Sequence, residues 1–220
     1  SYTPPEGLDS LAAGQSVAEM FTYAITSGTL EDKAEVTVTV VGVNDAPTSM
    51  DVTGVATNED ISVELTAAMF PFSDVDDGAA LDGVRIGSVE GGLLFLDRSE
   101  AQVEDGSLIA LEDLDELRFI PAPDLNGTDA AGFRFAVSDG ELESVSHAFR
   151  FDITPVPDEP VTMSDSYTLT ESGTLEVPAS EGVLANDVDV DGDGITVTQF
   201  RILSDVGGSL QIDSDGALVF

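Results

Sequence analysis

Apolar and polar side chains alternate one by one along much of this chain. The alternation is clearest in "AEVTVTVVGV" (34–43), "GFRFAVSDG" (132–140), "AFRFDITPV" (148–156) and "ITVTQFRIL" (195–203). A period of two, rich in Val, Ile, Thr and Phe, is typical of strands that bury one face. Gly, Asp, Asn and Pro separate these stretches at short intervals. The pattern therefore predicts an all-β chain built from β-sandwiches.

Two segments depart from the alternation. "LDSLAAGQSV" (8–17) and "DRSEAQVEDG" (97–106) predict a single helical turn or a short helix each. Aromatic residues within the strands recur at every second position, and they are Phe21, Tyr23, Phe133, Phe135, Phe149 and Phe151. Since one face of each strand must be buried, we predict that these rings pack in a core rather than stack on sugars.

An internal repeat organises the chain. "FTYAITSGTLEDKAEVTVTVVGVNDAPT" (21–48) and "FRFAVSDGELESVSHAFRFDITPVPDEPV" (133–161) both lead through an alternating strand into an acidic linker that contains Pro. After the linkers, "TNEDISVEL" (57–65) parallels "LTESGTLEV" (169–177), and "FSDVDDG" (72–78) parallels "LANDVDVDGDG" (184–194). We predict the closing part of one domain at 1–47, a complete sandwich at 48–157 and the opening part of another at 158–220.

Charge narrows the possible partners. The chain has 43 acidic and 7 basic residues, for a net charge of −36. Nucleic acid is excluded as a partner because phosphate binding requires Lys and Arg. Excess acid can also serve solubility or a salty habitat, but neither explains why the acids gather in short Asp-rich turns. Cysteine is absent, so disulfides and thiolate metal sites are excluded.

One acidic turn has the spacing of calcium ligands. Asp189, Asp191 and Asp193 alternate before Gly194, and Asp187 precedes them. Calcium binds six to eight oxygen atoms, and an Asp-x-Asp-x-Asp-Gly turn supplies three carboxylates. An EF-hand would need Glu at the twelfth loop position, which is Phe200 here. The turn therefore predicts a calcium site completed by residues from elsewhere, with a solvated turn as the alternative.

The residues of the repeat resemble known families. The stretch from "YTPPEGLDSL" to "GVNDAP" (2–47) resembles the closing half of VCBS repeats of giant bacterial surface proteins. "LDELRFIPAPDLNGTDAAGFRFAVSDGELES" and "SGTLEVPASEGVLANDVDVDGDGITVT" resemble bacterial cadherin-like repeats. The resemblance implies tandem immunoglobulin- or cadherin-like β-sandwiches, calcium at domain junctions, and a place in long extracellular adhesins or secreted matrix proteins.

The same resemblance implies two sets of ligands. Junctions of this kind combine linker acids with an Asp-x-Asp turn of the next domain. The first set would be Asn44, Asp45, Asp74 and Asp76, with Asp139 as a further candidate. The second set would be Asp158, Glu159, Asp187 and Asp189.

The expected function is therefore that of a spacer stiffened by calcium in a bacterial adhesin, with calcium ions and neighbouring repeats as partners. We expect no enzyme, because the chain lacks a Cys nucleophile, a G-x-S-x-G elbow and a phosphate loop. The single histidine, His147, lies in a strand and is interpreted as structural. Two alternatives stay open. One is a module that binds polysaccharide or protein, and the other is association with another copy through "GALVF" (216–220) and "SYTPPEG" (1–7).

Overall fold

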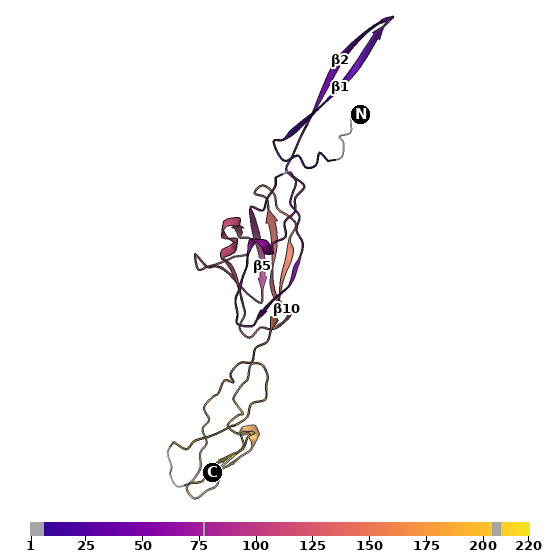
Figure 1. Ribbon diagram of the computed structural model, residues 1–220. Coiled ribbons are helices and arrows are strands. Elements are labelled where there is room, and N and C mark those ends of the chain that lie inside the picture. The colour runs from indigo at the N-terminus through magenta and orange to yellow at the C-terminus, as the bar shows by residue number, and fades with distance from the viewer. Residues whose placement is uncertain (1–6, 77, 204–207) are drawn as a thin grey trace. The chain divides into compact units, whose positions relative to one another are not determined.

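A computed structural model describes residues 7–76, 78–203 and 208–220 (Figure 1). The chain is nearly all β, which confirms the predicted fold class. It divides into two compact units, Ser1–Thr154 and Pro155–Phe220. The finer boundaries at residues 47 and 157 stay a prediction. No helix in the described part of the chain is long and apolar enough to cross a membrane.

The first unit begins with a long hairpin (indigo to violet in Figure 1). Strands β1 (Ser16–Ser27) and β2 (Leu30–Val41) pair antiparallel along their full length. Gly28 has a φ of 63° in the two-residue turn, a conformation that glycine adopts without strain. The helix predicted over 8–17 is wrong. Turns occupy this segment up to residue 14, where Gly14 has a φ of 82°, and β1 begins at Ser16.

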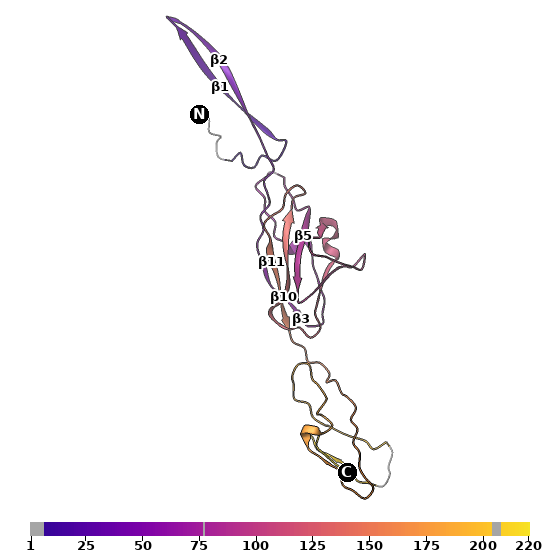
Figure 2. The same ribbon diagram turned by 180° about the vertical axis from the view of Figure 1, so that it is seen from behind.

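The rest of the first unit is a two-sheet sandwich. One sheet has the order β3-β11-β10-β5-β8, in which β3 is parallel to β11 and the other neighbours are antiparallel (Figure 2). Its strands are β3 (Val52–Asn58), β5 (Gly83–Glu90), β8 (Leu108–Ala110), β10 (Gly127–Ser138) and β11 (His147–Thr154). The other sheet, β4-β9-β6-β7, comprises β4 (Val63–Glu64), β6 (Gly92–Leu96), β7 (Ala101–Gln102) and β9 (Leu117–Pro121).

The structure confirms the strands predicted from the sequence in the sandwich and hairpin, but not the predicted helix. The strands predicted at 132–140 and 148–156 are confirmed by β10 and β11, and the one at 34–43 by β2. The helix predicted over 97–106 is wrong, because residues 101–102 pair with β6 as strand β7. The helices here are the 3-10 turns η1 (Ala67–Met69) and η2 (Leu111–Glu116).

An aromatic cluster fills the space between the two sheets. Phe133 stacks on Phe149 with ring centroids 4.8 Å apart, and Phe119 stacks on Phe151 at 4.2 Å. These four side chains and Phe135 are at most 2% exposed. The core prediction is thus confirmed for the rings of β10 and β11. It fails for the hairpin, where Phe21 is 43% exposed and no residue of β1 or β2 is buried.

The second unit buries fewer apolar side chains than the first, and among its described residues these are Val177 and Leu218. A three-stranded sheet has the order β12-β14-β13, formed by β12 (Glu176–Val177), β13 (Gln211–Ile212) and β14 (Leu218–Val219). The 3-10 turn η3 (Ala179–Glu181) follows β12. The strand predicted at 195–203 is wrong, because residues 192–203 form no strand in the structure. The apolar alternation is present there, but no neighbouring strand pairs with it in the described part of this unit.

Candidate metal site

A short antiparallel bridge pairs the end of the first linker with the sandwich. Thr48 and Ser73 exchange backbone hydrogen bonds of 2.7 and 3.0 Å. Asp45 lies three residues before Thr48, and Asp76 lies three residues after Ser73. The Asp45 N–H donates to Asp76 Oδ2 at 2.8 Å. The Asp76 N–H in turn donates to Asp74 Oδ1 at 2.9 Å. The linker and the Asp-x-Asp turn, predicted as parts of one site, are therefore in direct contact.

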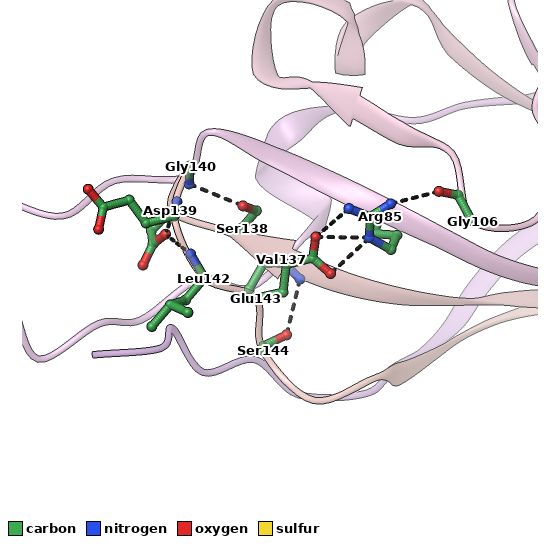
Figure 3. Close-up of polar contacts among 10 residues, drawn as sticks. Arg85, Gly106, Val137, Ser138, Asp139, Gly140, Leu142, Glu143 and Ser144 are labelled. Carbon is green, nitrogen blue, oxygen red and sulfur yellow. Dashed lines mark hydrogen bonds and ion pairs between the residues drawn. The ribbon is translucent and has the colours of Figure 1, made fainter. Parts of the chain in front are cut away.

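Asp139 joins this group from a loop distant in sequence. The Asn44 side-chain amide donates to Asp139 Oδ2 at 2.9 Å and to the Asp45 carbonyl at 3.1 Å. The other oxygen, Asp139 Oδ1, accepts from the Glu141 and Leu142 N–H groups at 2.7 Å each. Figure 3 shows this carboxylate against the backbone of its own loop. The first predicted ligand set thus comes together around the linker.

An ion pair holds the loop that carries Asp139. Arg85, on β5, donates through Nε to both Glu143 oxygens at 2.8 Å and through Nη2 to one of them at 2.6 Å. Its Nη1 donates to the Gly106 carbonyl at 2.7 Å (Figure 3). A bidentate Arg–carboxylate pair fixes orientation as well as distance. The loop after β10 is therefore anchored to the neighbouring strand β5.

Two carboxyl groups of this loop have perturbed pKa values. Burial is the largest influence on Asp139 and raises its pKa, but hydrogen bonds from Leu142, Asn44 and Glu141 together lower the pKa below its ordinary value. The Arg85 hydrogen bonds lower the pKa of Glu143 against a smaller opposing effect of burial. Both groups are therefore ionised at neutral pH, and folding favours that charged state.

The Glu143→Gln substitution tests this anchor. Because the pKa of Glu143 is lower in the folded state, its contribution is complete above its ordinary pKa and is lost as the pH falls through the folded-state pKa. The pair is partly open to solvent, so we expect a loss of about 0.5–1 kcal/mol at pH 7 and little loss in acid. Urea unfolding at both pH values measures this. The exposed neighbour substitution Glu141→Gln is the control, and an equal loss at both pH values would contradict the ion-pair explanation.

The Asp-x-Asp turn contains buried carboxylate oxygens that lack a donor. Asp76 is only 6% exposed. Among the described residues, no hydrogen-bond partner reaches Asp76 Oδ1 or Asp74 Oδ2, although both atoms are buried. A buried, unsatisfied polar group costs about 1–3 kcal/mol, and more when it is charged. Carboxylate and amide oxygens are the ligands that Ca²⁺ prefers, so the residue types of this linker and turn suit a calcium ion.

The second unit repeats the arrangement. Val161 and Val188 form the bridge, with hydrogen bonds of 2.7 and 3.0 Å. Asp158 lies three residues before Val161, and Asp191 lies three residues after Val188. The Asp158 N–H donates to Asp191 Oδ2 at 2.7 Å. Asp191 therefore corresponds to Asp76, and Asp189 corresponds to Asp74.

The remaining predicted ligands of this unit, Asp187, Asp189 and Glu159, make no hydrogen bond with Asp158 or Asp191 among those described here. Asp187 accepts at Oδ1 from the Met163 N–H at 2.7 Å, away from the Asp158–Asp191 contact. Asp189 accepts at Oδ1 from the Asp193 N–H at 3.1 Å, which closes the turn on itself. Glu159 is exposed. The contact between linker and turn therefore points to Asp191 rather than Asp187 as the second acid of the pair.

Glu59 is a buried acid that the sequence did not assign to a ligand set. It follows β3, is 2% exposed, and accepts from Asn126 Nδ2 at 3.1 Å. Its backbone N–H donates to the carbonyl of Thr154, the last residue of the first unit. The only sequence signal was the acidic pair 59–60 directly after a strand, which is also common in ordinary turns.

The repeated arrangement of linker and turn agrees with a comparison of sequence families. The model of the bacterial Ig domain matches residues 44–152 and again 157–220. The chain belongs to this family. Its two bacterial Ig repeats are consecutive, and each match includes the linker acids described above. The finer resemblance to VCBS and cadherin-like repeats stays a prediction.

Other comparisons add little to the family. A solved structure, that of surface layer protein SbsC, domains 4–9, is similar over 92% of this chain and 30% of that chain, with 13% identity and a TM-score of 0.28. Similarity at this level carries no functional conclusion. No curated protein matches the sequence. Tandem bacterial Ig domains are typically structural modules of cell-surface proteins, and this coarse role fits the interpretation of the chain as a spacer.

Proposed function

We propose that these bacterial Ig repeats are extracellular spacers of a surface adhesin or matrix protein, and that calcium bound at the linkers stiffens them. The observation that carries this proposal is the buried Asp76 carboxylate, whose Oδ1 has no donor in the described structure. A buried charge needs a partner, and the ion pairs of the described residues involve none of Asp45, Asp74 and Asp76. A divalent cation supplies that partner.

The first linker would be fastened by such an ion. Asn44 and Asp45 belong to the linker, whereas Asp74, Asp76 and Asp139 belong to the sandwich. An ion bound by both groups adds metal–oxygen bonds to the hydrogen bonds already present and neutralises their repulsion. The linker then loses freedom relative to the sandwich, and the array becomes stiffer.

The second linker supports the same role. Asp158 and Asp191 repeat the contact of Asp45 with Asp76, and Asp189 repeats the position of Asp74. Asp187, Asp193 and Glu159 lie close to these residues in sequence and add to the local negative charge. Two equivalent linkers in one chain are what a repeated calcium-dependent joint requires.

Isothermal titration with calcium tests the proposal directly. Asp76→Asn keeps the acceptor for the Asp45 N–H but removes one charge, so we expect at least a tenfold loss of affinity at one site. Asp105→Asn removes the same charge from an exposed turn elsewhere and should leave binding unchanged. The proposal fails if the unmodified protein binds no calcium, or if both variants weaken binding equally, since general charge attraction would explain the latter.

A further inference from the structure

The chain contains a single Asn-Gly pair, Asn126–Gly127, at the start of strand β10. An asparagine side chain deamidates when the backbone nitrogen of the next residue attacks its carbonyl carbon. Glycine in that next position favours the attack, because it has no side chain to obstruct the approach. Each of the other three asparagines precedes an acidic residue, and they are Asn44, Asn58 and Asn186. The sequence therefore singles out Asn126.

The structure leaves this pair open to water. All of residues 126–129 are exposed. The register of β10 with β11 shifts between Gly127 and Ala131, so strand pairing does not hold this segment continuously. Gly127 has a φ of 128°, a backbone conformation that residues with a side chain rarely adopt. A segment of this kind opens locally at a lower free energy than the whole sandwich.

The Asn126 side chain supplies a hydrogen-bond donor to an acidic part of the sandwich. Its Nδ2 donates to Glu59 Oε2 at 3.1 Å, and Glu59 is only 2% exposed. Two further acids are close to this pair in sequence, and the Asp124 N–H donates to Asp60 Oδ1 at 3.4 Å. An ionised carboxylate in place of the Asn126 amide would only accept hydrogen bonds, and it would add a like charge.

We propose that Asn126 is a modification site, where spontaneous deamidation converts the side chain to a carboxylate and weakens the first sandwich as the protein ages. The reaction needs water as its only co-reactant. It goes beyond the proposed role as a spacer, and it does not depend on calcium.

The reaction proceeds through a cyclic succinimide. The Gly127 backbone nitrogen forms a bond to Asn126 Cγ and loses its proton, while the Cγ–Nδ2 bond breaks and ammonia leaves with that proton. Water then adds to either carbonyl carbon of the ring and opens it, which gives aspartate or isoaspartate. The oxidation state of carbon does not change, so no oxidant or reductant is required.

Both products change the contact with Glu59 in the same way. Each removes the Nδ2 donor and places a negative charge close to a buried carboxyl group. Isoaspartate also inserts one more carbon into the backbone where β10 begins. Because the reaction does not reverse, the folded state loses stability in proportion to the fraction of molecules converted.

Peptide mapping of the whole protein by mass spectrometry tests the modification. After incubation in warm, mildly alkaline buffer, we expect the mass gain of an exchange of NH₂ for OH at Asn126. Its rate should exceed the rates at Asn44, Asn58 and Asn186 about tenfold or more, which corresponds to a barrier lower by about 1.4 kcal/mol. The protein unfolded in urea is the positive control. Conversion of Asn126 in urea but not in the folded protein would overturn the proposal, as would equal rates at all four asparagines.

The Asn126→Asp variant measures the effect on stability, because it carries one product of the reaction from the start. In urea unfolding with chelator present, we expect the equilibrium constant for unfolding of the first sandwich to rise about tenfold. Gln102→Glu is the matched control, since it makes the same exchange of groups on the exposed strand β7 and should have almost no effect. If Asn126→Asp is as stable as the unmodified protein, or if the control loses as much, the proposed effect of the modification is wrong.

Discussion

Calcium should raise the midpoint of thermal unfolding of the first sandwich by about 10 °C over the value in chelator. An ion at a hundredfold excess over its Kd, bound to the folded state alone, adds about 2.7 kcal/mol of stability. For a domain of this size that free energy corresponds to a shift of the expected order. Calorimetric melting in calcium and in chelator, at matched ionic strength, measures it.

The Asp76→Asn variant should be less stable than the unmodified protein in calcium, and at least as stable as the unmodified protein in chelator. In calcium the variant loses the ion and its stabilisation, so it unfolds below the unmodified protein. In chelator it removes one of several neighbouring negative charges and leaves an amide in place of a buried oxygen without a donor. Both changes relieve a cost of the folded state, so the variant should then unfold at the same temperature or higher.

Magnesium at the same concentration is the control for general screening. Mg²⁺ requires a more regular octahedral geometry and retains its water, so we expect a much smaller shift than with calcium. Equal midpoints in calcium and chelator would contradict the calcium site. A variant that is less stable than the unmodified protein by the same amount in both conditions would contradict the role of Asp76 as a calcium ligand.

Phe133→Ala should destabilise the first sandwich by about 4 kcal/mol, a large part of the stability of a typical domain. The ring is 2% exposed, stacks on Phe149 and lies 6.4 Å from Phe70 between centroids. Its removal leaves a cavity that the surrounding rings of two sheets cannot fill without rearrangement. Denaturant unfolding of the unmodified protein and the variant gives the difference directly.

Phe21→Ala is the matched control, since Phe21 occupies the equivalent position of the repeat. We expect it to leave the unfolding of the first sandwich within about 0.5 kcal/mol of the unmodified value. The same substitution at the same place in the repeat should thus have a large effect on stability in the sandwich and almost none in the hairpin. A comparable loss for Phe21→Ala would mean that the hairpin belongs to the core of the first sandwich.

Several features of this protein follow from sequence alone. The period of two in β2, β10 and β11 predicted strands with one face fit for burial, and the recurrence of linkers and turns predicted tandem sandwiches. The resemblance to known repeats also implied the first linker set, and the structure brings two of its members, Asp45 and Asp76, into contact. Such patterns are local, and local backbone preferences and turn chemistry operate in every copy of a repeat.

Only the tertiary structure decided which of these local possibilities are realised. Phe133 is buried and Phe21 is exposed, although both have the same pattern, because periodicity shows which face can be buried and not whether another sheet covers it. Residues 195–203 likewise form no strand, since no neighbouring strand pairs with them in the described structure. Asp139 reaches Asn44 across 95 residues through the pairing of strands. Contacts between residues so far apart depend on the arrangement of the sheets, which no local pattern encodes.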